Sequence, residues 1–206
     1  MAYSDFTLEK IKHEFGIENQ IKSIFTQKIE AIAISETLKE SLAFANDIPK
    51  RSEKAKSEFV VLPILIELLK KNKDFLTIHS GENLNADKKQ GLVGECDYIL
   101  TKNTHSLSLN LPIISILEAK KDDIEIGIAQ CAAQLYGARI FNQKDKIELP
   151  FLYGCVTNSK EWQFIRLTDS VIEIHNQTYF LPDIENILGI FQFIVDSYKK
   201  IISQKD

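Results

Sequence analysis

Residues 113–120 read IISILEAK, a mostly apolar stretch whose last three residues include two charged ones, Glu118 and Lys120. Side chains of a strand alternate between its faces. One face is expected to carry Ile114, Ile116, Glu118 and Lys120, and the other Ile113, Ser115, Leu117 and Ala119. A carboxylate and an amine are costly to bury unless they pair or bind a metal. The stretch therefore indicates either a structural ion pair or a metal-dependent site.

A second carboxylate lies in the run GECDYIL at residues 94–100, where Asp97 is surrounded by residues typical of a buried strand. Two carboxylates that converge beside a lysine suit a hard, oxygen-ligated cation, and magnesium needs only one or two carboxylates from the protein. We therefore expect Asp97 and Glu118 to hold Mg²⁺, with Mn²⁺ as an alternative ion.

Outward from these strands, periodicity and turn residues predict an α/β arrangement. Helices are expected in two segments of 5–44 separated near Gly16, at 52–71 with Pro63 bending it or marking its first turn, at 124–141 and at 183–202. Strands are expected at 75–79, 95–101, 113–120, 151–157, 161–167 and 171–175.

The 206 residues, 44% of them hydrophobic, suit one domain. We divide it into a helical N-terminal extension (1–50), a core (51–170) and a C-terminal strand and helix (171–206). The net charge of −4 neither supports nor excludes nucleic acid. Basic residues cluster within 50–56, 70–73 and 88–89, which indicates either a phosphate-binding surface or solvated helix ends and loops.

The cysteines indicate the cellular compartment, and the hydropathy indicates whether a segment could span a membrane. Cys96, Cys131 and Cys155 are far apart in apolar segments, as buried thiols are in reducing compartments. No apolar run approaches the roughly 18 residues of a membrane span, and no secretion signal is visible. The sequence therefore predicts a cytoplasmic protein without a membrane partner.

The motifs together carry a resemblance to a known superfamily. The expected order is a helix, a strand with Asp97, a strand with Glu118-Ala119-Lys120 and a helix with Gln130. This order and these residues resemble the PD-(D/E)xK nucleases. Residues 52–164 are similar to an uncharacterised bacterial family within that superfamily, through SEKAKSEF, PIL, GLVGECDYIL, ILEAKK, GIAQCAAQ and YGCVTNSKEWQF.

The resemblance implies a restriction-endonuclease-like core, a mixed central β-sheet flanked by helices, and magnesium-dependent cleavage of nucleic acid, with DNA the expected substrate. It also implies roles for four groups. Asp97, Glu118 and the carbonyl of Ala119 would bind the metal, and Lys120 would orient or activate water. A lysine suits this role as a compact point charge.

Many members of the superfamily add a glutamate from the first core helix, and this chain offers Glu53 and Glu58. At about 100° per residue, Glu58 lies opposite Glu67, which interrupts an apolar run and is expected on the solvent side. Glu53 falls within about 40° of Glu67. We therefore predict Glu58 as the inward glutamate.

Gln130 resembles the glutamine that supports the site or contacts DNA in part of the superfamily; the alternative is a solvent-facing amide. Gln134 stands where some families carry tyrosine and has a weaker claim. Trp162 and Phe164 alternate on a strand, where core packing is favoured over base stacking. The histidines form no ligand set, and of these only His79, at a strand end, is kept as a candidate site residue.

Two hypotheses follow. The first is a metal-dependent nuclease, with a homodimer as a weaker expectation. The second is a nuclease-fold binding or assembly protein without turnover, and the intact set of Asp97, Glu118 and Lys120 argues against it.

Overall fold

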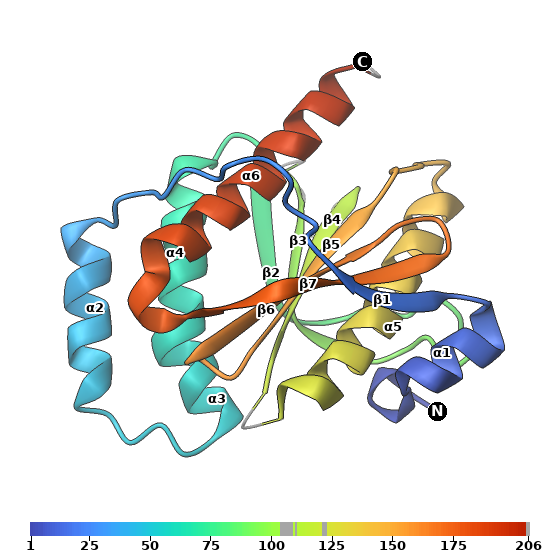
Figure 1. Cartoon of the computed structure of the whole chain (residues 1–206), viewed down its shortest axis with the longest axis horizontal. Coiled ribbons are helices and arrows are strands. Elements are labelled where there is room, and N and C mark those ends of the chain that lie inside the picture. Colours follow the sequence, from blue (N-terminus) through green and yellow to red (C-terminus); the bar gives the residue numbers. More distant parts are fainter. Residues whose placement is uncertain (104–108, 110, 121–122, 205–206) are drawn as a thin grey trace.

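A computed structural model describes the whole chain except residues 104–108, 110, 121–122 and 205–206 (Figure 1). Its strands form one open, mixed sheet in the order β1-β7-β6-β5-β4-β3-β2. Their bounds are β1 Glu18–Lys22, β2 Leu76–Asn83, β3 Glu95–Lys102, β4 Ile113–Ala119, β5 Leu152–Thr157, β6 Glu161–Leu167 and β7 Val171–Phe180. The pairs β1–β7 and β4–β5 are parallel and the others are antiparallel.

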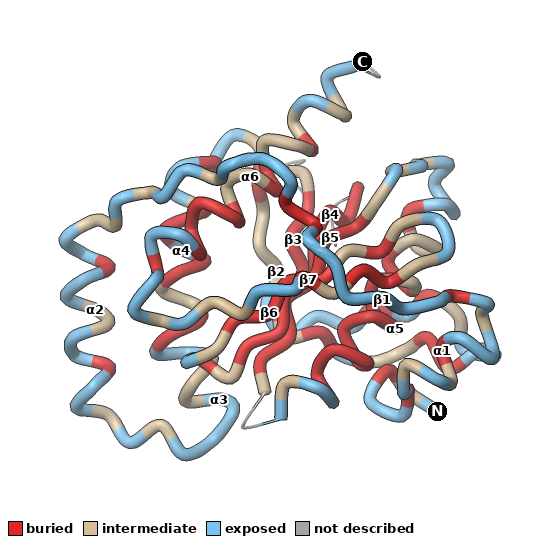
Figure 2. The backbone as a smooth tube through the Cα atoms, in the orientation of Figure 1, coloured by how far each residue is buried: buried red, intermediate tan, exposed pale blue. Residues whose placement is uncertain are grey.

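Helices cover both faces of the sheet, which gives two hydrophobic cores (Figures 1 and 2). The helices are α1 Leu8–Phe15, α2 Glu36–Asn46, α3 Glu53–Lys56, α4 Leu62–Lys71, α5 Ile124–Lys144 and α6 Ile184–Ser203. Apolar residues of α4 and α6 pack on one face, together with residues 24–38 of the N-terminal extension. Apolar residues of α5 pack on the other face, together with residues 3–17. The chain is therefore an α/β protein, as the hydrophobic pattern predicts. Within the described residues its open sheet has seven strands, of which the pattern predicts all except β1.

The N-terminal extension differs from its prediction. Gly16 does end a helix, in the left-handed conformation at φ 68°. The residues that follow, however, form strand β1, and the next helix begins only at Glu36. Every residue of β1 is exposed, so the strand shows no alternation of apolar and polar residues. Its conformation depends on pairing with β7, more than 150 residues away, which no local pattern reports.

The segment 52–71 is helical throughout, as predicted, but a π-helical turn at Ser57–Val61 separates α3 from α4. Pro63 lies in the first turn of α4. Proline lacks the N–H that would bond four residues back, and a wider turn just before it accommodates that loss. Figure 1 shows α3 below α4 at the edge of the molecule.

Glu67 is buried, and the prediction that it marks the solvent side is wrong. It is 5% exposed, and its carboxylate accepts hydrogen bonds from Ser35 N (3.0 Å) and Ser35 Oγ (2.8 Å). Ser35 is the residue that caps α2. The charge that interrupts the apolar run thus anchors a second helix.

The predicted alternation along β4 is interrupted once. Pairing with β3 passes from Leu100–Ser115 to Thr101–Ile113, so Ile114 is an extra residue in a bulge. Ile114 consequently packs in the core under α4 and α6, whereas Ile116 packs in the core under α5. Beyond the bulge the alternation is regular, so Glu118 and Lys120 still share a face.

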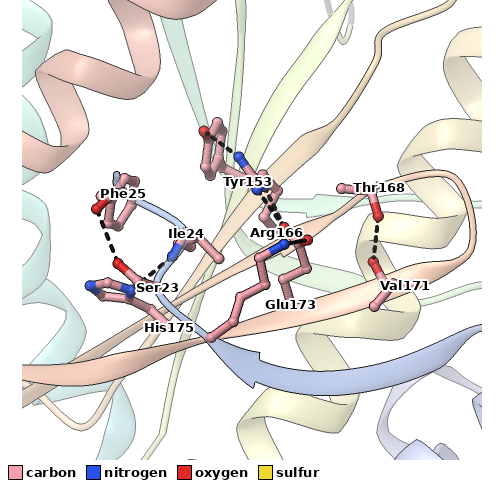
Figure 3. Close-up of polar contacts among 10 residues, drawn as sticks. Ser23, Ile24, Phe25, Tyr153, Arg166, Thr168, Val171, Glu173 and His175 are labelled. Atoms are coloured by element: carbon pink, nitrogen blue, oxygen red, sulfur yellow. Dashed lines mark hydrogen bonds and ion pairs between the residues drawn. The ribbon is translucent and has the colours of Figure 1, made fainter. Parts of the chain in front are cut away.

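A charged cluster ties β1, β6 and β7 together on the α6 side of the sheet (Figure 3). The Glu173 carboxylate, 4% exposed, pairs with Arg166 (2.6 Å) and with Lys22 (2.7 Å). Next to it, Ile24 N donates to His175 Nδ1 at 3.2 Å. The cluster holds the N-terminal edge strand against the body of the sheet.

Cys96, Cys131 and Cys155 are free and buried, which confirms their assignment as core residues. Among the residues that the structure describes, none of the helices is long and apolar enough to cross a membrane.

Candidate active site

Asp97 and Glu118 come together where β3 and β4 begin to separate. The last paired residues before this point are Tyr98 and Leu117. One step further, Asp97 Oδ2 accepts a hydrogen bond from Ala119 N at 2.7 Å. The Asp97 carboxylate thus replaces a strand–strand hydrogen bond, and this contact places it beside the backbone of Glu118.

Glu118 is 3% exposed, and both of its carboxylate oxygens accept hydrogen bonds. Oε1 accepts from Lys120 Nζ at 2.8 Å and from Gln130 Nε2. Oε2 accepts from Gln134 Nε2 at 2.8 Å. Lys120 Nζ also donates to Gln130 Oε1 at 2.8 Å. The four side chains form one closed network between β4 and α5.

The backbone holds Lys120 in this network. Lys120 N donates to Thr157 O at the end of β5, at 2.7 Å, and the Lys120 side chain is 16% exposed. A Cβ at Gly127, in the first turn of α5, would lie 2.4 Å from Val156 Cγ1 and 2.9 Å from Lys120 Cγ. Only glycine lets α5 approach the lysine stem this closely.

The pKa values of Asp97 and Glu118 are both raised. Burial, followed by repulsion from Asp97, raises the pKa of Glu118 to about 7, although Lys120 opposes the shift. Burial also raises the pKa of Asp97, while the Ala119 N–H and Lys120 act in the opposite direction. Within the described part of the chain, these two carboxylates thus share one lysine, and each makes ionisation of the other harder.

Asp97 lines a cavity of about 520 Å³, which lies between α3 and the point where β3 and β4 separate. Its lining includes four carboxylates, those of Glu53, Glu58, Glu95 and Asp97, and the ammonium of Lys54. The walls therefore carry more negative than positive charge. Ala119 also lines the cavity, and Glu118 and Lys120 are its two neighbours in the sequence.

The choice of Glu58 over Glu53 rests on a wrong premise, because Glu67 is buried. Both glutamates line the cavity. Glu58 has a side chain that is 49% exposed and lies 3.8 Å from Lys54 Nζ. Glu53 is the glutamate of this helix whose charge contributes to raising the pKa of Asp97. Both glutamates are exposed, so burial favours neither of them as a metal ligand, and the prediction of Glu58 as the inward glutamate is not supported.

The π-helical turn positions this rim against β3. Ser57 Oγ lies 2.7 Å from the hydroxyl of Tyr98, and that hydroxyl also donates to Ser57 O at 3.3 Å. Tyr98 directly follows Asp97 in the sequence. The turn therefore fixes the position of Glu53 and Glu58 relative to Asp97, and π-helical turns occur frequently at functional sites.

Gln130 and Gln134 are both buried, so the solvent-facing alternative for Gln130 is wrong. The weaker claim assigned to Gln134 is also corrected, because its amide donates to Glu118 as directly as that of Gln130. Their four-residue spacing puts them on one face of a helix. That spacing is the sequence signal that groups Gln134 with Gln130, and the packing of α5 against β4 brings both amides to Glu118.

Other residues singled out by the sequence lie elsewhere. Trp162 and Phe164 are fully buried on the α6 side, which confirms core packing. His79 contacts Thr101 Oγ1 at 3.2 Å, and burial lowers its pKa. Lys121, which completes the ILEAKK motif, lies outside the described residues.

The donor set fits magnesium in part. Within the described residues, no three His, Cys, Asp or Glu side chains are grouped closely enough to hold a metal. Asp97 and Glu118 supply the one or two carboxylates that Mg²⁺ takes from proteins, with water completing its shell. A carboxylate has about four lone-pair positions. Both residues therefore retain acceptor capacity beyond the hydrogen bonds described above.

The residues and their arrangement define a class: an α/β protein with an open mixed sheet and a carboxylate–lysine site where the adjacent strands β3 and β4 separate. In comparisons with known proteins, no protein-family model matches this chain and no curated protein matches it significantly.

Proposed function

We propose that the chain is a metal-dependent nuclease of the PD-(D/E)xK type, with a restriction-endonuclease-like core. The observation that carries the proposal is the set of Asp97, Glu118 and Lys120 at the ends of two adjacent strands, with two carboxylates sharing one lysine. The element order α4, β2, β3, β4, α5, β5 supports it, because it matches the order that the resemblance implies.

Each residue then has a distinct task in phosphodiester hydrolysis. Asp97, Glu118 and the Ala119 carbonyl would hold the ion, with Glu53 or Glu58 at the rim. Bound magnesium supplies Lewis-acid polarisation of a phosphoryl oxygen and lowers the pKa of water. The Lys120 ammonium orients water or stabilises negative charge developing on the phosphate. Gln130 contacts both Lys120 and Glu118 and fixes their relative position.

One observation favours the second candidate, a nuclease-fold binding or assembly protein without turnover. Both Glu118 oxygens are already engaged by Lys120, Gln130 and Gln134, which is also how a purely structural ion pair would look. On this alternative, the network stabilises the junction of β4 and α5 and binds no cation.

Cleavage and metal binding, measured together, decide between the two candidates. Purified protein is incubated with single- and double-stranded DNA and with RNA, in magnesium or manganese and in chelator. We expect metal-dependent cleavage, with DNA as the preferred substrate. Calorimetric titration with magnesium is run in parallel, because a nuclease of this type binds the ion before it cleaves.

Lys120→Ala is the decisive variant, because it removes a charge that acts on substrate and is not a metal ligand. We expect it to abolish cleavage while magnesium binding remains. Lys199→Ala is the matched control, since it removes an ion-paired lysine from α6 and should leave cleavage unchanged. Equal turnover in Lys120→Ala and wild type would assign Lys120 to the structural alternative.

A further inference from the structure

Strand β1 is an open edge of the sheet. It stands at one end of the strand order, and among the described residues no other strand pairs with its outer side. All five of its residues are exposed, and Ile21 is 74% exposed. In Figure 2 the strand appears in the colour of exposed residues. Such an edge presents unpaired backbone N–H and C=O groups to any strand that can align with it.

The bonds between β1 and β7 show which backbone groups point outward. Glu18 N donates to Ser170 O at 2.8 Å, so the backbone of Glu18 faces β7. Because this direction alternates along a paired strand, Gln20 and Lys22 face β7 as well. The N–H and C=O groups of Asn19 and Ile21 therefore point to the open side.

We propose that β1 is a homodimer interface, at which β1 of a second copy pairs antiparallel with a two-fold axis at Gln20. In this register Asn19 lies opposite Ile21 of the second copy, so outward-facing backbone groups meet outward-facing groups. Gln20 lies opposite Gln20 of the second copy, and the backbones of these two residues form no hydrogen bonds with each other. The two sheets then continue into one.

The charges of β1 are self-complementary in this register alone. Glu18 comes directly opposite Lys22 of the second copy, and Lys22 opposite Glu18, which is favourable for cross-strand pairs. Antiparallel registers centred on Asn19 or Ile21 place a charged residue against Gln20. Parallel pairing places like charges side by side, which is unfavourable. The pattern Glu18, Gln20, Lys22 thus selects one partner orientation.

The existing ion pairs of these residues are compatible with the dimer. Lys22 Nζ lies 2.7 Å from Glu173 Oε1, and Glu18 lies 3.0 Å from Lys12 Nζ. A lysine ammonium has three donors, so Lys22 can keep Glu173 and accept a second carboxylate. On the opposite face, Ile21 gains its symmetry-related copy as a diagonal neighbour and loses part of its exposed apolar surface.

Cross-linking tests the register directly. Gln20→Cys places two thiols across the axis at a Cα separation of about 4.5 Å, within the range for a disulfide. Asn19→Cys is the matched control, because its copies are diagonal neighbours about 7–8 Å apart. The native cysteines are buried and do not compete. Under mild oxidation we expect disulfide-linked dimer from Gln20→Cys and none from Asn19→Cys.

Sedimentation equilibrium of the full chain provides the second measurement. Ile21→Pro removes an outward-facing N–H, and proline is tolerated on an edge strand at such a position. We expect a wild-type dimer whose Kd rises with salt, and a Kd at least about tenfold higher in folded Ile21→Pro. A monomeric wild type, an unchanged Kd in Ile21→Pro, or equal cross-linking of the two cysteine variants would each overturn the proposal.

Discussion

Glu118 and Glu173 are two buried glutamates on strands of the same sheet, exposed by 3% and 4%, yet their environments shift the pKa in opposite directions. For Glu118, burial and repulsion from Asp97 prevail, and the pKa rises to about 7. For Glu173, burial acts in the same direction, but hydrogen bonds from Lys22 and Arg166 outweigh it and the pKa falls.

The difference lies in the balance of charge. Two cations, Arg166 and Lys22, meet one carboxylate at Glu173. Among the residues that the structure describes, one cation, Lys120, serves both Asp97 and Glu118. Burial alone therefore does not distinguish a structural ion cluster from a candidate site. A surplus of carboxylates over cations does, because such a site is stabilised by an additional cation.

The largest expected effect is on cleavage. Asp97→Asn and Glu118→Gln each remove a carboxylate from the site, and we expect the cleavage rate to fall by roughly a thousandfold, as when a group that stabilises the transition state is lost. Glu173→Gln should leave the rate per folded molecule unchanged. Initial rates in magnesium, normalised to the folded fraction from circular dichroism, measure both. A comparable loss in Glu173→Gln would remove the functional distinction between the clusters.

The next effect is on stability in chelator. Glu173→Gln leaves two cations without an anion, and we expect it to lower the free energy of unfolding by about 2–3 kcal/mol, less than for a fully buried pair because Lys22 is partly exposed. Glu118→Gln leaves Asp97 and Lys120 balanced, so its stability should remain within about 1 kcal/mol of wild type or rise. Denaturant titration compares them. A loss of about 3–5 kcal/mol in Glu118→Gln would favour the structural alternative for the Glu118–Lys120 pair.

The smallest effect is the pH dependence of that same comparison. A carboxyl with a raised pKa binds more protons in the folded state, so its contribution to stability falls as pH increases from 4.5 to about 7. Wild type should therefore lose about 1 kcal/mol or more relative to Glu118→Gln between pH 5 and pH 8. Glu173, whose pKa is lowered, changes its contribution only below pH 4.5. A pH-independent difference between wild type and Glu118→Gln would show that Glu118 is ionised throughout.

The site divides into a part visible in the sequence and a part that is not. Asp97, Glu118 and Lys120 stand out because each is a charge in an apolar strand. Glu67 is also a charge in an apolar run, and the same argument places it wrongly on the surface. It is buried because Ser35, far away in sequence, satisfies its carboxylate. A helical period reports which residues share a face, but it does not report what covers that face.

From residue 52 onward, the order of helices and strands follows from the sequence alone. The same is true of the shared face of Glu118 and Lys120 and of the burial of the cysteines and of Trp162. These features follow from local periodicity and from the transfer free energy of apolar side chains. The tertiary structure alone decided three other features: the pairing of β1 with β7, the bulge at Ile114, and the contact of Gln134 with Glu118. Each depends on segments distant in the chain, whose relative position is set only when the whole sheet and both of its helical layers pack together.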